Sequence, residues 1–353
     1  MSKNSKVLAG CTVGLDVGDR RSVVCVLDAD GEVIETGEIA TTRKSIRSRF
    51  GGQACMRVVL ETGTHANWLD EEFKLLGHEV VVANARNVRA ITAADHKSDR
   101  NDAEMLARLG RADLRLLSPV NPRSEEVRKD LLLLRARAAL VAQRTLLVNH
   151  VRRAVKPFGE RMPEKSTESF HKLALPKALA PALAPMMQLL KSITEQIAAY
   201  DEQIKELGHD KYPQMSRLQQ VYGVGVLTAV AFVLMIVDPS RFKNNRDVGA
   251  FVGLIPRKHQ SGASDPQLRI TKSGDTMMRV LLVQCAQHIL RKSSPDSDLK
   301  RFGLRIARKG DKISKRKAVV AVARKLSVLL LALWKSGEKY QPLRASVPSA
   351  SKA

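Results

Sequence analysis

The chain carries, at residues 96–104, the stretch His-Lys-Ser-Asp-Arg-Asn-Asp-Ala-Glu. Asp99 and Asp102 stand three residues apart at the predicted start of a helix that runs to Leu109. Residues with this spacing share one face of a helix, so both carboxylates can point into one site. An ordinary alternative is that Ser98 or Asp99 caps the helix and Asp102 is a favourable acid of its first turn.

The residues before this stretch predict an α/β domain over residues 1–120. Buried or alternating apolar runs predict strands at 12–17, 22–27, 33–39, 56–60 and 79–82. Helical patterns lie at 44–50 and 65–76. Three antiparallel strands followed by alternating helices and strands indicate a mixed sheet.

Two further acids fall on this predicted sheet. Asp16 lies on the first strand, and Glu61 ends the strand predicted beside it. With Asp99 and Asp102 they give the order D, E, D, D, which is expected of ribonuclease-H-like nucleases. Two carboxylates about 4 Å apart repel by about 4 kcal/mol at an effective dielectric constant of about 20, so such a cluster needs cations. Oxygen ligands select Mg²⁺, for which Mn²⁺ can substitute. Taken singly, Asp16 could be a strand-end residue and Glu61 could cap the following helix.

The composition indicates a polyanionic partner. The net charge is +23 and aromatic residues make up only 4% of the chain, so phosphate contacts rather than base stacking are expected to dominate binding. No apolar run is long enough for a membrane span, and no signal peptide opens the chain. The four cysteines show no close spacing. These features predict a cytoplasmic protein, associated with the nucleoid when active.

Residues 121–210 form a basic helical region. A helix is predicted over 124–156, and its charge is almost entirely of one sign, which favours nucleic-acid contacts by Arg135, Arg144 and Arg152 over a lattice of salt bridges. The following helix carries apolar residues at alternating separations of four and three, from Met186 to Leu207. This seam predicts either a coiled coil between chains or a helical hairpin packed within one chain.

Residues 211–340 form a mainly helical C-terminal domain, followed by a tail at 341–353. Gly223 and Gly225 lie between two predicted helices and resemble a helix-hairpin-helix DNA-binding element, although a plain tight turn is the alternative. A polar loop over 257–271 contains Ser261. The predicted cations for a transferring phosphate follow: Arg269, Lys272 and Arg279. A second basic cluster lies at 301–317, before a helix predicted over 318–334.

Several motifs, in this order, resemble the DEDD transposases of the one-ten group of insertion sequences, which are bridge-RNA-guided recombinases. The motifs cover nearly the whole chain: Gly14-Leu15-Asp16-Val17-Gly18, Glu61-Thr62-Gly63-Thr64, Lys97-Ser98-Asp99-Arg100-Asn101-Asp102-Ala103, Tyr222-Gly223-Val224-Gly225, Phe251-Val252-Gly253-Leu254-Ile255-Pro256, Gln260-Ser261-Gly262 and Ile270-Thr271-Lys272-Ser273-Gly274-Asp275 with Arg279. The chain departs from the family pattern at Thr271 and Ser273-Gly274-Asp275, where the family often has Ser-Lys-x-Gly-Asn.

The resemblance implies a RuvC-like domain in which Asp16, Glu61, Asp99 and Asp102 hold Mg²⁺, and a transposase domain whose nucleophile is Ser261. It implies a 5′-phosphoserine link to DNA and a non-coding RNA that pairs with target and donor DNA. It also implies a homo-oligomer, dimer or tetramer, in which the two domains of different protomers complete the site.

Three other functions stay open on the sequence. A Holliday-junction or structure-specific endonuclease would use the acids alone, and a non-catalytic RNA-binding protein would use only the basic helices. An actin-like sugar kinase would use residues 14–18 as a phosphate-binding hairpin, but a charge of +23 disfavours it.

Overall fold

The computed structural model describes residues 10–84, 98–262, 264–266 and 268–344, and it divides into two compact units, residues 1–124 and 125–353. Residues 96 and 97 of the acidic motif lie outside the described residues. Within the described part of the chain, no helix is both long enough and apolar enough to span a membrane.

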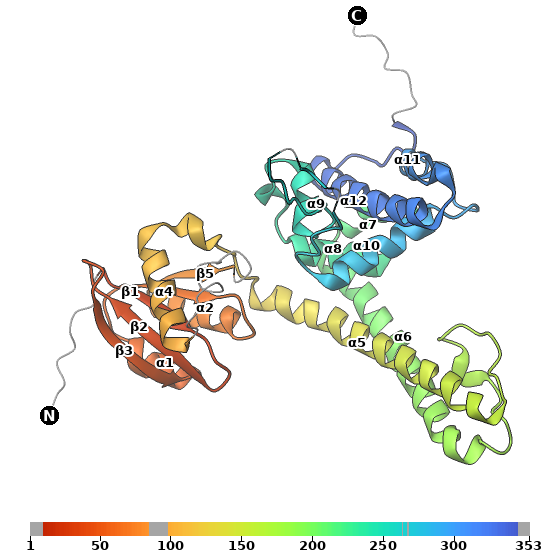
Figure 1. The fold of residues 1–353 in the computed structure, drawn as a ribbon, viewed down its shortest axis with the longest axis horizontal. Coiled ribbons are helices and arrows are strands. Elements are labelled where there is room, and N and C mark those ends of the chain that lie inside the picture. The colour runs from red at the N-terminus through yellow and green to blue at the C-terminus, as the bar shows by residue number, and fades with distance from the viewer. Residues whose placement is uncertain (1–9, 85–97, 263, 267, 345–353) are drawn as a thin grey trace, which may run out of the picture. The chain divides into compact units, whose positions relative to one another are not determined.

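The first unit is built on one mixed five-stranded sheet (Figure 1). Its strand order is β3-β2-β1-β4-β5, with β1 antiparallel to β2 and parallel to β4. The strands are β1 (Thr12–Asp16), β2 (Arg21–Leu27), β3 (Val33–Ala40), β4 (Arg57–Glu61) and β5 (Glu79–Ala83). The prediction of a mixed-sheet α/β domain is therefore confirmed. No strand begins or ends more than one residue away from its predicted position.

Helices cover both faces of this sheet. One face packs against α1 (Arg43–Phe50) and α2 (Ala66–Leu75) through a core that includes Val13, Leu15 and Phe73. The other face packs against α4 (Asp99–Ala112). Side chains alternate between the faces of a strand, so the apolar residues of β1 serve the first core while Gly14 faces α4.

A buried carboxylate ties α1 to α2. The Glu72 side chain is only 1% exposed, accepts a 2.6 Å hydrogen bond from Arg43 Nη1, and also pairs with Arg47. The hydrogen bond from Arg47 holds the pKa of Glu72 below its ordinary value, against the opposing effect of burial, and Arg43 adds to the lowering. A depressed pKa contributes stability above the unfolded-state pKa, and that stability is lost as the pH falls through the folded-state value.

We therefore expect Glu72→Gln to lower the unfolding free energy of the first unit by about 1–2 kcal/mol at neutral pH. The deficit should shrink as the pH falls below the ordinary glutamate pKa of about 4.3 and vanish once the pH lies below the lowered folded-state pKa. Denaturant titrations across this pH range measure both effects. Glu38→Gln is the control, since Glu38 pairs with Arg21 in the open and should cost less than about 0.5 kcal/mol. A pH-independent deficit would contradict the assignment.

The second unit begins with a long helical hairpin (Figure 1). It consists of α5 (Glu125–Ala154) and α6 (Ala180–Lys211), which pack along each other. Of the α6 seam, Leu190, Ile193, Ile197 and Ile204 are buried within the chain. The structure therefore shows the intrachain packing that the seam allowed.

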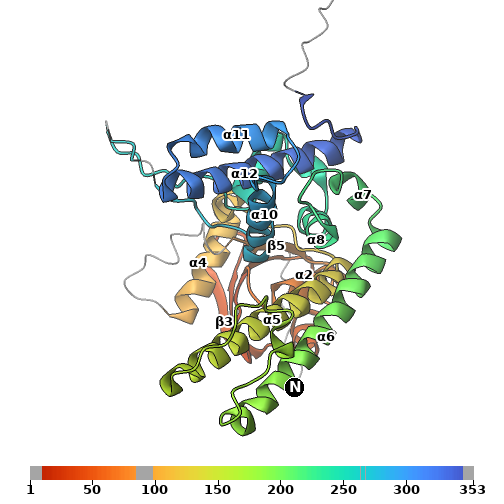
Figure 2. The same ribbon diagram turned by 90° about the vertical axis from the view of Figure 1, so that its right-hand side faces the viewer.

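The remainder of the second unit is a helical domain around α8 (Val226–Ile236), whose residues 228–236 are all buried. The other helices are α7 (Met215–Leu218), α9 (Val248–Phe251), α10 (Thr276–Ile289), α11 (Asp298–Ile306) and α12 (Lys312–Ser336). Figure 2 shows α11 lying along α12. Short 3₁₀ turns occur at Leu114–Leu117, Lys156–Phe158, Phe170–Lys172, Pro239–Arg241, Asn245–Asp247 and Ala307–Lys309.

The residues after Lys335 are held against the domain. The Asp298 amide donates to the carbonyl of Pro342 at 2.7 Å, and the Tyr340 amide donates to Gln220 Oε1 at 2.8 Å. Backbone groups thus fix the chain as far as Pro342.

Candidate functional site

Two of the four predicted acids lie at neighbouring strand ends. The parallel register of β1 and β4 pairs Leu15 with Leu60, so Asp16 and Glu61 each follow the last registered pair. Neighbouring strands lie about 4.8 Å apart. Gly14 and Val59, two residues earlier on each strand, face α4. Because side chains alternate with a period of two, Asp16 and Glu61 face α4 as well.

The direction of α4 brings the other two acids to the same edge. A methyl group at Gly14 would overlap the Ala103 carbonyl oxygen, and a methyl at Gly110 would overlap Val59 and lie 3.6 Å from Thr12. The helix thus runs from the carboxyl end of β1 toward its start. Its first turn, with Asp99 and Asp102, therefore lies toward the edge where β1 and β4 end.

Helix α4 is capped by Ser98, whose hydroxyl accepts from the Asn101 amide at 3.2 Å. The capping role predicted as an alternative for this stretch therefore belongs to Ser98. Asp99 is exposed and Asp102 is half-buried. Neither Asp99 nor Asp102 serves as the cap of α4.

The four acids share an edge and a face, but they do not form a closed cluster. Across the described residues, no three His, Cys, Asp or Glu side chains lie close enough together to hold a metal ion. Asp16 and Glu61 make further interactions of their own. The donor set is nevertheless all carboxylate oxygen, which is the ligand chemistry of Mg²⁺ and Mn²⁺.

A polar group that the sequence analysis did not single out lies at the same edge of the sheet. His65, four residues after Glu61, has Nε2 3.2 Å from Asp19 Oδ1. Trp68 Nε1 donates to His65 Nδ1 at 3.0 Å, which leaves Nε2 to carry the proton of a neutral ring. The sequence gives only one indication of this pair: Asp19 follows the strand that ends on Asp16, and His65 follows the strand that ends on Glu61.

Ser261 lies at the tip of a short two-stranded arm in the second unit. The arm begins with a bridge between Pro256 and Ile270 and ends with a bridge between Ser261 and Ser264. At the tip the Ser261 amide donates to the Ser264 carbonyl at 3.2 Å, and the Ser264 amide returns a 3.0 Å bond. Ser261 is exposed, and these bonds use only its backbone. Its hydroxyl is therefore presented to solvent.

The base of this arm is locked by close backbone contact. Gly253 and Gly274 have positive φ angles, and a methyl group on either would overlap a backbone carbonyl of the facing segment. Arg279 Nη1 donates to the Ser273 carbonyl at 2.7 Å and Nη2 to Thr276 Oγ1 at 3.0 Å. Arg279 was predicted to bind nucleic acid, and here its guanidinium holds the turn that supports the arm. Lys272 is exposed, with a positive φ of 55°.

The remaining predicted contacts lie in different settings. Gly223 has a φ of +87° and Gly225 is the exposed N-cap of α8, while the preceding α7 is a single turn. Arg135 and Arg269 are exposed. Arg144 is buried, with its side chain 6% exposed and Nη2 3.8 Å from Glu168. Its burial gives no support to the prediction that Arg144 binds nucleic acid.

Comparison with known proteins places this architecture in a family. A family model of IS110-type DEDD transposases matches residues 13–158, and the model described as the transposase IS116/IS110/IS902 family matches residues 215–302. The transposase for insertion sequence element IS1328 of Yersinia enterocolitica is 30% identical over 239 residues, which cover 65% of this chain and 70% of the relative. The chain belongs to the IS110 family of DEDD transposases.

Further relatives align with more than four fifths of this transposase. The transposase for insertion sequence element IS1111A of Coxiella burnetii is 29% identical over 341 residues, covering 93% of this chain and 91% of the relative. The pilin gene-inverting protein of Moraxella bovis is 26% identical and covers 82% and 83% of the two chains. The predictions of this family and of a DNA transposase enzyme are confirmed.

Proposed function

We propose that this transposase is an RNA-guided DNA recombinase that mobilises its own insertion sequence through a 5′-phosphoserine link at Ser261. The observation that carries the proposal is the exposed Ser261 hydroxyl, at the tip of an arm whose bridging bonds use only backbone atoms. Related proteins support strand exchange over hydrolysis, since one relative is a pilin gene-inverting protein and inversion requires rejoining of the cut strands.

The proposed chemistry conserves the energy of the phosphodiester. Ser261 Oγ attacks the phosphorus, the Oγ–P bond forms as the P–O3′ bond breaks, and the hydroxyl proton is transferred to solvent while the departing 3′ oxygen takes up a proton. A 3′-hydroxyl of another strand then attacks the phosphoserine, which restores a phosphodiester and frees Ser261. Water is not consumed, so cutting and rejoining balance.

Asp16, Glu61, Asp99 and Asp102 are the residues that we assign to a divalent cation, Mg²⁺ with Mn²⁺ as a substitute. Their common edge, common face and all-oxygen chemistry support the assignment. When bound, such an ion supplies Lewis-acid stabilisation of the charge on the transferring phosphate. Both the carboxylates of the first unit and Ser261 of the second are required for the reaction.

The basic residues contact the nucleic acids in this proposal. Arg269 and Lys272, both exposed, bind phosphates near the arm, and Arg279 positions it. Gly223 and Gly225 form a helix-hairpin-helix-like contact with duplex DNA. The partners are target DNA, donor DNA and an RNA encoded by the element. Leu132, Leu146 and Leu189 are at least half exposed on the α5–α6 hairpin, which supports a coiled-coil contact in a dimer or tetramer.

The test uses protein purified from cells that carry the parent element, together with its co-purifying RNA and plasmid DNA bearing the element ends. We expect covalent protein–DNA adducts that fall at least about tenfold after RNase treatment or chelation by EDTA, and that return when Mg²⁺ is added back to the chelated sample. Adducts that survive RNase would contradict RNA guidance. Cut strands without adducts would favour a structure-specific endonuclease.

A further inference from the structure

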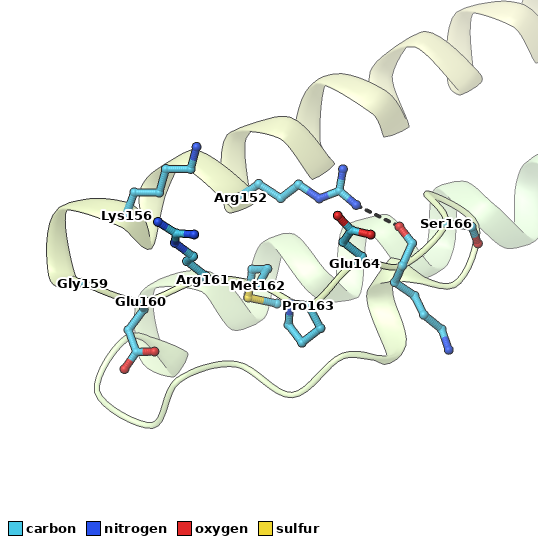
Figure 3. A pocket seen from close by; sticks show the side chains of 10 residues that line it. Arg152, Lys156, Gly159, Glu160, Arg161, Met162, Pro163, Glu164 and Ser166 are labelled. Carbon is cyan, nitrogen blue, oxygen red and sulfur yellow. Dashed lines mark hydrogen bonds between the residues drawn. The ribbon is translucent and has the colours of Figure 1, made fainter.

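The free end of the α5–α6 hairpin holds a cavity of about 990 Å³ that the proposed reaction does not use. It is lined by Arg152, Lys156, Gly159, Glu160, Arg161, Met162, Pro163, Glu164, Lys165 and Ser166. Four of these side chains are basic and two are acidic. In Figure 3 the side chains of Lys156 and Arg161 lie on one side of the loop, whereas the Glu160 carboxylate points away from them.

One cation of this cavity is held in a fixed orientation. Arg152 Nη2 donates to the Lys165 carbonyl at 2.8 Å, drawn as a dashed line in Figure 3. Its guanidinium also lies 5.2 Å from the centre of the Phe170 ring. Phe170 is fully buried. An arginine braced against a buried ring and a carbonyl loses little entropy on binding an anion, which is the behaviour of a preorganised phosphate contact.

An exposed aromatic residue adjoins the cavity lining in the sequence. Phe158 is 68% exposed and directly precedes the lining residue Gly159, in a chain in which aromatic residues make up only 4%. The turn Lys156–Phe158 ends on Gly159, whose φ of +77° reverses the chain at this point. An exposed ring next to basic side chains offers a stacking surface together with phosphate contacts, which is the combination that single strands use.

We propose that this hairpin tip binds an unpaired nucleotide, with Phe158 stacking on the base and Arg152, Lys156 and Arg161 contacting its phosphates. An aromatic platform beside a cationic groove is the arrangement that recognises single strands, since every base has a π-face. A paired base inside a duplex cannot reach such a ring without unstacking. The proposal deepens the proposed function by naming where an unpaired strand is held, and it rests on nucleic acid being the partner.

The test measures binding of fluorescent oligonucleotides to the full-length protein, freed of its own RNA, at about 0.3 M salt to suppress weak phosphate contacts. The probes are a uridine oligoribonucleotide of about 12 residues, the matching thymidine oligodeoxyribonucleotide and a DNA duplex. Phe158→Ala should weaken single-strand binding about tenfold and leave the duplex unchanged, and Phe158→Tyr should restore it. Arg161→Ala should lower the slope of log binding affinity against log salt concentration by the amount expected for about one lost phosphate contact.

Matched controls come from the same chain. Leu75→Ala removes a side chain that is 76% exposed on α2, and Lys177→Ala removes an exposed cation near the same end of the hairpin. Both should bind all probes as the wild type does. A thiouridine-substituted probe should crosslink within residues 152–166. Tighter binding of the ribonucleotide or of the deoxyribonucleotide identifies which strand occupies the tip.

Three results would overturn the inference. Phe158→Ala and Arg161→Ala could both bind single strands normally, or could lose single strands and duplex equally. Alternatively, Phe158→Ala could change the oligomeric state while binding is unaltered, which would make the tip an interface between copies. In each case the formation of adducts by wild-type protein is a separate measurement, so the proposed function can stand or fall independently.

Discussion

Ser261→Ala is expected to reduce covalent protein–DNA adducts by at least about a thousandfold, because it removes the proposed nucleophile. The substitution should not disturb the arm. Both bridging bonds at the tip join backbone atoms of Ser261 and Ser264, and the exposed hydroxyl fills no core position. Binding of RNA and DNA should therefore persist. The adducts are counted as SDS-resistant complexes on end-labelled DNA.

Ser264→Ala is the matched control for this experiment. Ser264 is exposed, lies on the facing strand of the arm, and takes part in the same two backbone bonds. It should form adducts at the wild-type rate. Normal adducts with Ser261→Ala would exclude the serine link, and equal loss with Ser264→Ala would show that the arm's conformation, rather than one hydroxyl, was lost.

The sheet and its acids could be predicted because their signals are local. Buried runs with turn residues between them define β1 to β5, and the carboxylates follow strand ends in the sequence itself. What could not be predicted is the placement of α4. The direction of α4 across β1 depends on the contact between Gly14 and Ala103, which are far apart in the chain. The hydrophobic periodicity of the sequence gives no information on contacts of this kind.

The helix boundaries in the second unit were harder to predict than the strands of the first. Single residues at the helix starts explain why. Proline usually breaks a helix, yet α6 starts at Ala180 with Pro181 in its first turn, where a missing amide costs nothing. Helix α12 starts at Lys312 rather than 318, since the Asp311 carboxylate accepts from the amides of Ile313 and Ser314.

The arm that bears Ser261 shows the same limit. The sequence indicated a polar loop over 257–271, and the structure places a bridged arm there. The turn Lys272–Gly274 closes on Gly253 and Phe251, again through non-local backbone contact. The burial of Arg144 could not be predicted for a related reason. Whether a basic residue of helix α5 is exposed to solvent depends on which other segment packs against it. For Arg144 this is the segment that contains Glu168.

The tight contact between α4 and β1 leads to the second large expected effect. A single methyl group at Gly14 would overlap the Ala103 carbonyl oxygen and lie 2.7 Å from the Ala107 amide nitrogen. Both are backbone atoms, which cannot rotate away as a side chain can. Gly14→Ala should therefore displace α4 and lower the unfolding free energy of the first unit by about 3 kcal/mol or more.

Hydrogen exchange on the full chain measures this effect locally, because the second unit serves as an internal reference. The amides of Val13, Leu15 and Val24 should lose protection, while those of α8 should not change. Gly37→Ala is the control: it lies on β3 with no atom within 4 Å of the added methyl group, and it should change stability by less than about 0.5 kcal/mol. Because α4 carries Asp99 and Asp102, Gly14→Ala should also lose adduct formation although Ser261 is intact. If the amides of Gly14→Ala kept wild-type protection from hydrogen exchange, α4 would not be in tight contact with β1 at Gly14. The inference that the four acids share one edge of the sheet would then be wrong as well.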